Sequence, residues 1–348
     1  MIDLSVLIVN WNTKDVLADC LRALPEAIAP ISSETIVVDN GSSDGSPEMV
    51  SAQFPWVRLI ENRENAGFVH ATNQAIAASR GAYLLLLNSD AIAPPGSLAR
   101  MVSFMKAHPD AGAAAPKLVH PDGSFQASYA RFPTLLSESL SAFGLNRRLW
   151  GPYHPSPPPR PNETPHPVDW APGACLLLRR DVIEAVGPLD EGFWMYSEDT
   201  DLCYRIHRAG WKVYYLPDVA VIHLGGASSR QCRPESVARL YGSKVRFFRK
   251  HYGLLPAVLL SIAVAAAYAV KAGLAGLAYL SPRRREQART QFRTSRLVWE
   301  TTLSVLTGQK SQQSPAEENE DLPGFTAPVG LRPTPQLLPP DGKAKGVL

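Results

Sequence analysis

Cysteine is scarce in this sequence. Four cysteines are spread over 348 positions, with no Cys-x-x-Cys pair and no metal-ligand spacing: Cys20, Cys175, Cys203 and Cys232. This pattern excludes a disulfide framework and a zinc module, and it predicts reduced thiols in a cytosolic compartment. An excess of one charge is also missing, because a net charge of +3 at pH 7 is too small to indicate a nucleic-acid-binding protein.

Two short motifs are missing near the N-terminus. Residues 1–9 have no basic segment before their apolar stretch and no cleavage site, so we expect a strand there and not a signal peptide. The next residues, Asn10–Thr13, contain no glycine, and the G-x-G-x-x-G fingerprint of dinucleotide-binding folds is therefore absent. The missing fingerprint argues against an NAD-dependent enzyme.

A continuous apolar run, Tyr83–Leu87, has the length of a strand that is buried on both faces in the middle of a mostly parallel sheet. It stops at Asn88–Asp90, and Pro94–Gly96 prevent its continuation. Ligands of open α/β sheets bind at the carboxyl ends of strands, where Asp90 can hold a divalent cation on a phosphate-bearing substrate. The alternative interpretation is a turn with a capping aspartate.

Strands and helices are expected to alternate ahead of this run. The expected strands cover residues 4–9, 35–38 and 57–61, and the expected helices cover residues 13–24, the segment after Pro47 and residues 69–79. This alternation predicts an α/β fold with a doubly wound, mostly parallel sheet. Asp39 then ends its strand at the same sheet edge as Asp90. There it can hold the base and ribose of a nucleotide whose phosphates bind a cation at Asp90.

Four ordered motifs resemble those of the family 2 inverting glycosyltransferases, which have the GT-A fold and use nucleotide-diphosphate sugars. The motifs are Ser5–Asn12 (SVLIVNWN), Val37–Ser46 (VVDNGSSDGS), Asn65–Asn73 (NAGFVHATN) and Leu84–Asp90 (LLLLNSD). Within this family the sequence is most similar to the bacterial rhamnosyltransferase-like branch, over about residues 4–250. The donor-nucleotide residues that the resemblance implies are Asn10, Asp39, Asn65, Gly67, Asn73 and Ser89.

The resemblance also implies a metal site for Mg²⁺ or Mn²⁺. The family's D-x-D-type motif corresponds to Asn88–Asp90, where Asn88 replaces the first acid and Asp90 is left as the carboxylate ligand. A matching H-x-G-G-x-S stretch begins at His223, which implies that His223 completes the metal or diphosphate site. A lone histidine at a strand end is also compatible with a purely structural role.

A second acidic cluster, Glu198, Asp199 and Asp201, follows the aromatic segment Phe193–Tyr196. Acids in the first turn of a helix are favoured by the helix dipole, so ordinary capping is one interpretation. The aromatic side chains would also desolvate a carboxylate and raise its pKa towards that of a useful general base. The segment resembles the family's E-D motif, which implies that Asp199 deprotonates the acceptor hydroxyl with Glu198 beside it. Asp201 is expected to pair with Arg205, four residues later.

The candidate acceptor residues are Trp170, Gly173 and Trp194. An aromatic followed by a glycine at the start of a strand can stack on a sugar ring, and a packed core tryptophan is the alternative. We expect a helix over residues 135–149. The proline-crowded residues 151–167 are expected to form an extended connection that either flanks the acceptor site or is a plain surface loop.

The C-terminal third changes in composition. A basic helix is expected over residues 234–252, followed by the apolar residues 254–280 and by Arg283–Arg285. The apolar stretch is long enough to span a bilayer, but its basic flanks favour a helix in the membrane interface or a kinked hairpin. A single span and a buried core helix are the alternatives. The predicted domains are residues 1–230 for GT-A, 231–308 for a helical membrane-associating region and 309–348 for a disordered tail.

These patterns predict a metal-dependent inverting hexosyltransferase at the cytoplasmic face of the inner (plasma) membrane, held there peripherally or monotopically. The resemblance implies transfer of L-rhamnose from deoxythymidine-diphosphate rhamnose to a glycan or lipid-linked acceptor in cell-wall or surface polysaccharide synthesis. A nucleotidyltransferase acting on a sugar phosphate is one alternative, but it needs a glycine-rich basic loop that Asn10–Lys14 does not supply. A catalytically inactive sugar-binding scaffold is the other. The joint presence of Asp39, Asp90, Asp199 and His223 disfavours it.

Overall fold

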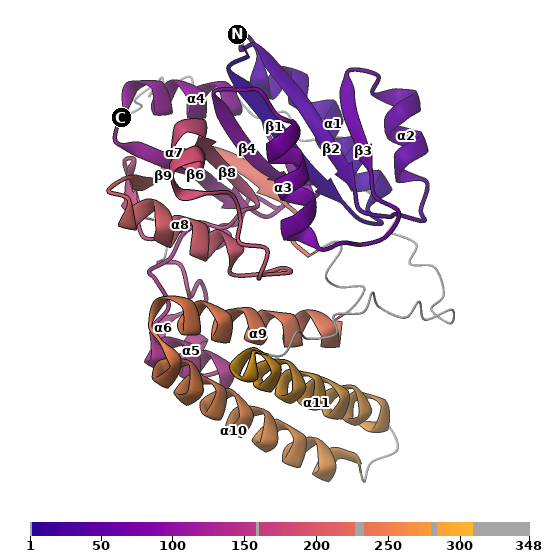
Figure 1. Cartoon of the computed structure of the whole chain (residues 1–348), viewed down its shortest axis with the longest axis vertical. Helices are drawn as coiled ribbons and strands as arrows, with labels where there is room; N and C mark the ends of the chain where they lie inside the picture. The colour runs from indigo at the N-terminus through magenta and orange to yellow at the C-terminus, as the bar shows by residue number, and fades with distance from the viewer. Residues whose placement is uncertain (1, 158–159, 227–232, 280–283, 309–348) are drawn as a thin grey trace, which may run out of the picture. The chain divides into compact units, whose positions relative to one another are not determined.

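The computed structural model describes residues 2–157, 160–226, 233–279 and 284–308 and contains a mixed sheet of nine strands (Figure 1). The strand order is β3-β2-β1-β4-β8-β6-β9-β5, with β7 paired to β9. The strands are β1 (Leu4–Asn10), β2 (Ser33–Asp39), β3 (Val57–Glu61), β4 (Tyr83–Asn88), β5 (Ala91–Ile92), β6 (Ala111–Val119), β7 (His166–Val168), β8 (Cys175–Arg179) and β9 (Lys212–His223). Since β5, β7 and β8 run against the other strands, the sheet is mostly parallel, as predicted.

The first four strands form the parallel half of the sheet. In the ladder between β1 and β2, Asn10 lies opposite Asp39, and in the ladder between β1 and β4, Val9 lies opposite Asn88. The carboxyl ends of β1, β2 and β4 therefore meet at one edge. The predicted ligand-binding edge of the sheet is thus formed by the carboxyl ends of β1, β2 and β4.

Helices cover both faces of the sheet. The helices are α1 (Lys14–Ile28), α2 (Ser46–Gln53), α3 (Phe68–Ala78), α4 (Ser97–Ala107), α5 (Leu135–Ala142), α6 (Asn146–Trp150), α7 (Arg180–Val186), α8 (Glu198–Arg208), α9 (Arg233–His251), α10 (Leu254–Tyr279) and α11 (Arg285–Thr307). Alternate residues of β4 enter two separate cores: Leu85 packs with residues of α1, α2 and α4, and Leu86 packs with residues of α3, α7 and α8. The sheet is therefore doubly wound, because helices pack on both of its faces and its central strand β4 is buried on both sides.

The antiparallel half places two segments that are distant in sequence beside each other. β5 pairs with β9 so that Ala91 lies opposite His223, and the backbone N–H of Leu224 donates to the carbonyl of Asp90 at 3.0 Å. β9 continues beyond Pro217, and its register against β6 shifts between Pro116 and Lys117. The long β9 thus brings His223 to the edge that holds Asp90.

The predicted single helix over residues 135–149 is wrong, because two short helices, α5 and α6, occupy this segment. Thr134 caps α5 with a hydrogen bond from the N–H of Ser137. Gly144, just after α5, has a φ of +75°, a left-handed conformation that interrupts a right-handed helix. The two helices border the cavity described below.

The C-terminal helices α9, α10 and α11 lie side by side in Figure 1. Phe248 of α9, Leu260 of α10 and Val298 of α11 are buried in the same cluster as the α8 side of the sheet. Through this shared apolar cluster, α9 packs against α8, the helix that begins with Glu198. The predicted disordered tail, residues 309–348, lies outside the described residues, and the predicted domain boundaries stay a prediction.

Candidate active site

The ends of β1 and β2 are joined by a polar network. Asn10 Nδ2 donates to Asp39 Oδ2 at 2.8 Å, and the backbone N–H of Ser42 donates to the other carboxylate oxygen at 2.8 Å. Thr13 Oγ1 donates to Asn10 Oδ1 at 2.6 Å and lies 2.9 Å from Ser89 Oγ. Three of the predicted nucleotide residues, Asn10, Asp39 and Ser89, are therefore brought together at one edge of the sheet.

Two further predicted nucleotide residues precede α3 and are held by Asn40, the residue after β2. Asn40 Nδ2 donates to Asn65 Oδ1 at 2.9 Å and to the carbonyl of Gly67 at 3.2 Å. Gly67 has a φ of +93°, and a Cβ atom there would come within 2.7 Å of the Trp194 indole. Trp194, a predicted acceptor residue, thus packs against the loop that holds predicted donor residues.

The side chain of Asn73 forms hydrogen bonds with the backbone of the protein. Its Nδ2 donates to the carbonyl of Leu189 at 2.9 Å, and its Oδ1 accepts the backbone N–H of Leu189 at 3.1 Å. Both ends of the amide therefore fix the segment that leads to Phe193. The nucleotide-binding role of Asn73 stays a prediction.

Asp90 and His223 meet where β5 pairs with β9. Asp90 Oδ1 lies 3.2 Å from His223 Nε2, and the two side chains are only 7% and 13% exposed. Asn88 Nδ2 lies 3.2 Å from the same imidazole nitrogen. Among the described residues, no group of three or more His, Cys, Asp or Glu side chains is arranged to hold a metal ion.

The donor atoms of Asp90 and His223 fit a divalent cation that is shared with a phosphate-bearing substrate. Carboxylate oxygen suits Mg²⁺ and Mn²⁺, and imidazole is a common metal ligand. Mg²⁺ is usually held by one or two carboxylates together with substrate phosphates, and not by a complete protein cage. One carboxylate and one imidazole, 3.2 Å apart, are therefore a sufficient protein contribution to such a site.

Glu198 and Asp199 open α8, after Ser197 in a left-handed conformation with a φ of +61°. Asp199 Oδ2 accepts the backbone N–H of Gly173 at 3.1 Å, and its Oδ1 accepts that of Thr200 at 2.6 Å. Oε2 of Glu198 is buried and has no hydrogen-bond partner among the described residues. Gly173, predicted as an acceptor residue, therefore holds the predicted base through its backbone.

The two carboxyl groups differ in their affinity for a proton. Burial raises the pKa of Glu198 well above its usual range, and the nearby charges of Asp199 and Asp201 raise it further. Burial also raises the pKa of Asp199, but hydrogen bonds from Gly173 and Thr200 favour its ionised form and oppose the rise. Glu198 therefore keeps its proton at a higher pH, and Asp199 is the carboxylate that can accept one.

A cavity of about 1020 Å³ adjoins this pair. Among the described residues, five separate segments line it, including Trp170, Glu198, Asp199, Glu138, Lys244 and residues 154–157. Trp170 is held by its indole N–H, which donates to the carbonyl of Arg131 at 2.9 Å. The predicted base, one predicted acceptor residue and the proline-rich connection thus border one space, large enough for a sugar and part of a longer acceptor.

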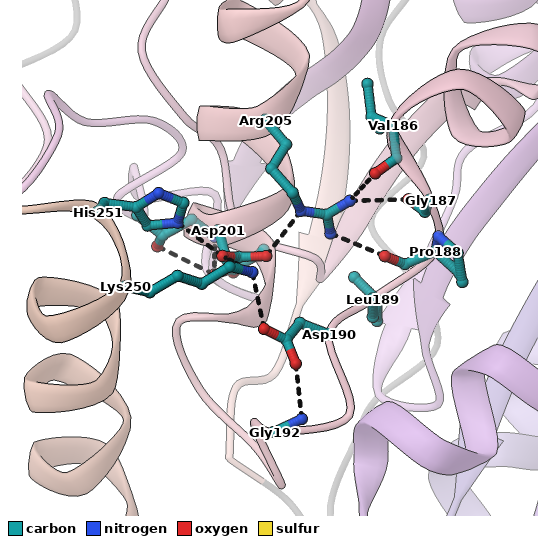
Figure 2. A network of polar contacts seen from close by, with 12 residues as sticks. Val186, Gly187, Pro188, Leu189, Asp190, Gly192, Asp201, Arg205, Lys250 and His251 are labelled. Atoms are coloured by element: carbon teal, nitrogen blue, oxygen red, sulfur yellow. Dashed lines mark hydrogen bonds and ion pairs between the residues drawn. The ribbon is translucent and has the colours of Figure 1, made fainter.

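Asp201 is the centre of the polar network in Figure 2. Its fully buried carboxylate accepts Arg205 Nε at 2.8 Å, Lys250 Nζ at 2.6 Å and His251 Nε2 at 2.7 Å. Burial by itself raises the pKa of Asp201, but hydrogen bonds from His251 and Lys250 and the charge of Arg205 outweigh it and lower this pKa to about 2. The predicted ion pair between Asp201 and Arg205 is confirmed. The same network connects the first turn of α8 to the end of α9.

The sequence did not predict the contacts of three residues that the structure places near the predicted site residues. Lys250 and His251 were seen only as part of a basic helix, because no local pattern indicates that they contact Asp201. Gln126 lies between β6 and α5, and its Oε1 is 2.7 Å from His223 Nδ1. An isolated glutamine in a loop gives no sequence signal for this contact.

Comparisons with known proteins identify the family of the chain. The family profile described as "Glycosyl transferase family 2" matches residues 5–187, and "Glycosyltransferase like family 2" matches residues 159–245. An N-acetylglucosaminyl-diphospho-decaprenol L-rhamnosyltransferase of Mycobacterium tuberculosis is 33% identical over 206 residues, which are 54% of this chain and 65% of that protein. The chain thus spans about 65% of the length of this curated relative. Rhamnosyltransferase WbbL of Escherichia coli is 38% identical over 63 residues, 18% of this chain and 24% of WbbL.

Solved structures show the same fold at low sequence identity. The mannosyltransferase PcManGT of Pyrobaculum calidifontis, in complex with GDP-Man and Mn²⁺, superposes with a TM-score of 0.50 at 18% identity, covering 88% of each chain. GalNAc-T7 with UDP, GalNAc and Mn²⁺ superposes with a TM-score of 0.52 at 16% identity, covering 72% of this chain and 48% of that one. The mixed, mostly parallel sheet is therefore of the GT-A type.

Proposed function

Because the chain belongs to glycosyltransferase family 2, we propose that it transfers L-rhamnose, with inversion, from deoxythymidine-diphosphate rhamnose to a lipid-linked glycan acceptor in cell-surface polysaccharide synthesis. The observation that carries this proposal is the position of Asp199. Its carboxylate borders a cavity of about 1020 Å³ and is held by the backbone N–H of Gly173. A buried base beside a space for an acceptor is what direct displacement at a sugar carbon requires.

In the proposed reaction, the acceptor hydroxyl lies in the cavity within reach of Asp199. The acceptor oxygen forms a bond to the anomeric carbon, the bond from that carbon to the diphosphate oxygen breaks, and Asp199 takes the hydroxyl proton. Glu198 stays protonated and limits repulsion in the pair. Mg²⁺ or Mn²⁺, held by Asp90 and His223, would neutralise charge on the nucleoside-diphosphate leaving group.

The donor assignment rests on the joined ends of β1 and β2. Asn10, Asp39 and Ser89 are linked through Thr13 on the same sheet edge as Asp90, which suits a nucleoside diphosphate laid along that edge. L-Rhamnose and an N-acetylglucosaminyl-diphospho-decaprenol acceptor are named for the M. tuberculosis relative. We propose the same donor and acceptor class here.

The exposed apolar surface of α10 supports the proposal of a lipid-linked acceptor. Within the described residues, α10 is the helix that is long and apolar enough to cross a membrane. One of its faces is buried, and side chains on the other are 43–69% exposed although all are apolar: Leu254, Leu255, Leu259, Ile262, Val270, Leu274 and Leu277. The helices α9 and α11, which pack along α10, have exposed charged residues such as Lys250 and Arg296. We therefore propose that α10 lies in the membrane interface at the cytoplasmic face.

A binding screen of nucleotide sugars with Mn²⁺ tests the donor assignment. Deoxythymidine-diphosphate rhamnose should compete best against fluorescent nucleotide, ahead of uridine- and guanosine-diphosphate sugars. A clear preference for a uridine donor would overturn the rhamnose assignment and leave the role of Asp199 standing.

A further inference from the structure

Gln126 contacts the imidazole of His223 on the side that faces away from Asp90. His223 Nδ1 lies 2.7 Å from Gln126 Oε1, and Gln126 Nε2 lies 3.5 Å from the carbonyl oxygen of His223. The side-chain amide of Gln126 therefore contacts both the imidazole ring and the backbone carbonyl of His223. Gly225 keeps this space open, since a Cβ atom there would lie 3.3 Å from Gln126 Nε2.

These two contacts fix the proton on the imidazole. Gln126 Nε2 can only donate, and the carbonyl of His223 is an acceptor, so the amide oxygen is the atom that faces the ring. A carbonyl oxygen can only accept, so Nδ1 must carry the hydrogen. In a neutral imidazole, Nε2 then presents its lone pair, and this nitrogen lies 3.2 Å from the Asn88 Nδ2 donor and 3.2 Å from Asp90 Oδ1.

The backbone around Gln126 supports this orientation. Its N–H donates to the carbonyl of Leu118 at 3.0 Å, and its own carbonyl accepts Ser128 Oγ at 2.7 Å. Ser128 in turn accepts the backbone N–H of Leu118 at 2.8 Å. Gln126 is therefore anchored to the end of β6, which is itself paired with the strand that holds His223.

We propose that Gln126 is a positioning residue for the metal site, holding His223 in the tautomer that offers Nε2 to a divalent cation shared with Asp90. The proposal rests on the metal-dependent glycosyl transfer proposed above. Partners that accept the second ring proton of a histidine ligand orient it and raise its basicity, and their loss costs about 10- to 100-fold in metal affinity. Gln126 contacts the proposed metal ligand His223 and would act on a cation only through it, so its effect should appear in metal affinity first.

The test is a Mn²⁺ titration of full-length protein with deoxythymidine diphosphate, followed by the electron paramagnetic resonance signal of free Mn²⁺. Gln126→Met keeps the length of the side chain but cannot accept the Nδ1 proton, and it should weaken Mn²⁺ binding by about 10- to 100-fold. Gln126→Glu restores an acceptor and should bind Mn²⁺ within about threefold of wild type or more tightly. Ser124→Ala, an exposed change in the same loop, should leave Mn²⁺ affinity unchanged.

Thermal unfolding of the same variants separates positioning from folding. Gln126→Met should melt close to wild type, while its Mn²⁺ affinity falls. Wild-type Mn²⁺ affinity in Gln126→Met, or equal losses in Gln126→Met and Gln126→Glu, would overturn the role of Gln126 and leave the proposed function intact. Absence of Mn²⁺ binding by the wild-type protein would overturn the metal site itself, and this inference with it.

Discussion

The backbone N–H of Gly173 donates to Oδ2 of Asp199 at 3.1 Å, from a segment 26 positions earlier in the chain. This bond holds the carboxylate at the border of the cavity and favours its ionised form. Glu198, the preceding residue, receives no such bond at Oε2, and burial raises its pKa well above the usual range. The hydrogen bonds to Asp199 thus favour the ionised form of one of two adjacent acids, and Oε2 of the other lacks such a bond.

The rate of transfer should depend on pH through Asp199. An aspartate that acts as a base must be ionised, so kcat/KM should fall as the pH drops through the pKa of Asp199, which burial raises above its ordinary value. Glu198→Gln keeps a neutral side chain of the same shape and should preserve both this acidic limb and most of the activity. A loss of the limb in Glu198→Gln, measured from pH–rate profiles, would assign the base to Glu198 instead.

Chelation should stop the reaction reversibly. Asp90 and His223 are the protein groups that fit a cation, so EDTA should abolish turnover, and added Mn²⁺ or Mg²⁺ should restore it. Asp90→Ala should remain inactive at any metal concentration. Full activity of the wild-type protein in EDTA would contradict the metal site.

The network around Asp201 should dominate local stability (Figure 2). Asp201→Asn leaves three basic side chains without their buried anion and should lower the free energy of unfolding by about 3–5 kcal/mol, measured in urea. Asp218→Asn, which removes an exposed partner of Arg100, should cost at most about 1 kcal/mol. An equal effect of the two substitutions would refute a structural role for the network.

The same network predicts how stability depends on pH. The pKa of Asp201 is about 2 in the folded protein and is ordinarily 3.8. Because it is lowered on folding, its contribution of about 2 kcal/mol is complete above the ordinary pKa and is lost as the pH falls towards 2. Asp201→Asn should lack this component of acid destabilisation.

Membrane binding should depend on the exposed face of α10. The double variant Ile262→Glu with Leu274→Glu places charges on two positions that are 60% and 62% exposed, so the fold should tolerate it. Losing the burial of two such side chains in lipid should weaken binding to anionic vesicles by about 100-fold or more in a sedimentation assay. Ser103→Glu, on an exposed position of α4, is the control and should bind as wild type does. Unchanged vesicle binding by the double variant would exclude α10 as the membrane contact.

The sequence allowed prediction of the sheet and of the residues at its edge, because strand ends can be read locally. Asn88–Asp90 and the loop that begins at Asp39 each lie at the end of a strand, and parallel pairing then places them at one edge. The contacts of His251 and Gln126 could not be predicted, because each joins residues far apart in the sequence. The break at Gly144 was missed, since an isolated glycine is compatible with helix continuation until its φ is known.

The most direct test of the proposed reaction is transfer of radiolabelled L-rhamnose from deoxythymidine-diphosphate rhamnose to N-acetylglucosaminyl-diphospho-polyprenol, measured for the wild-type protein and Asp199→Asn. The substitution preserves shape but cannot accept the proton, so turnover should fall by about 100- to 10,000-fold while donor affinity changes little. Turnover of Asp199→Asn within about tenfold of wild type would contradict the assignment of Asp199 as the base, and no transfer by the wild-type protein would contradict the proposed reaction.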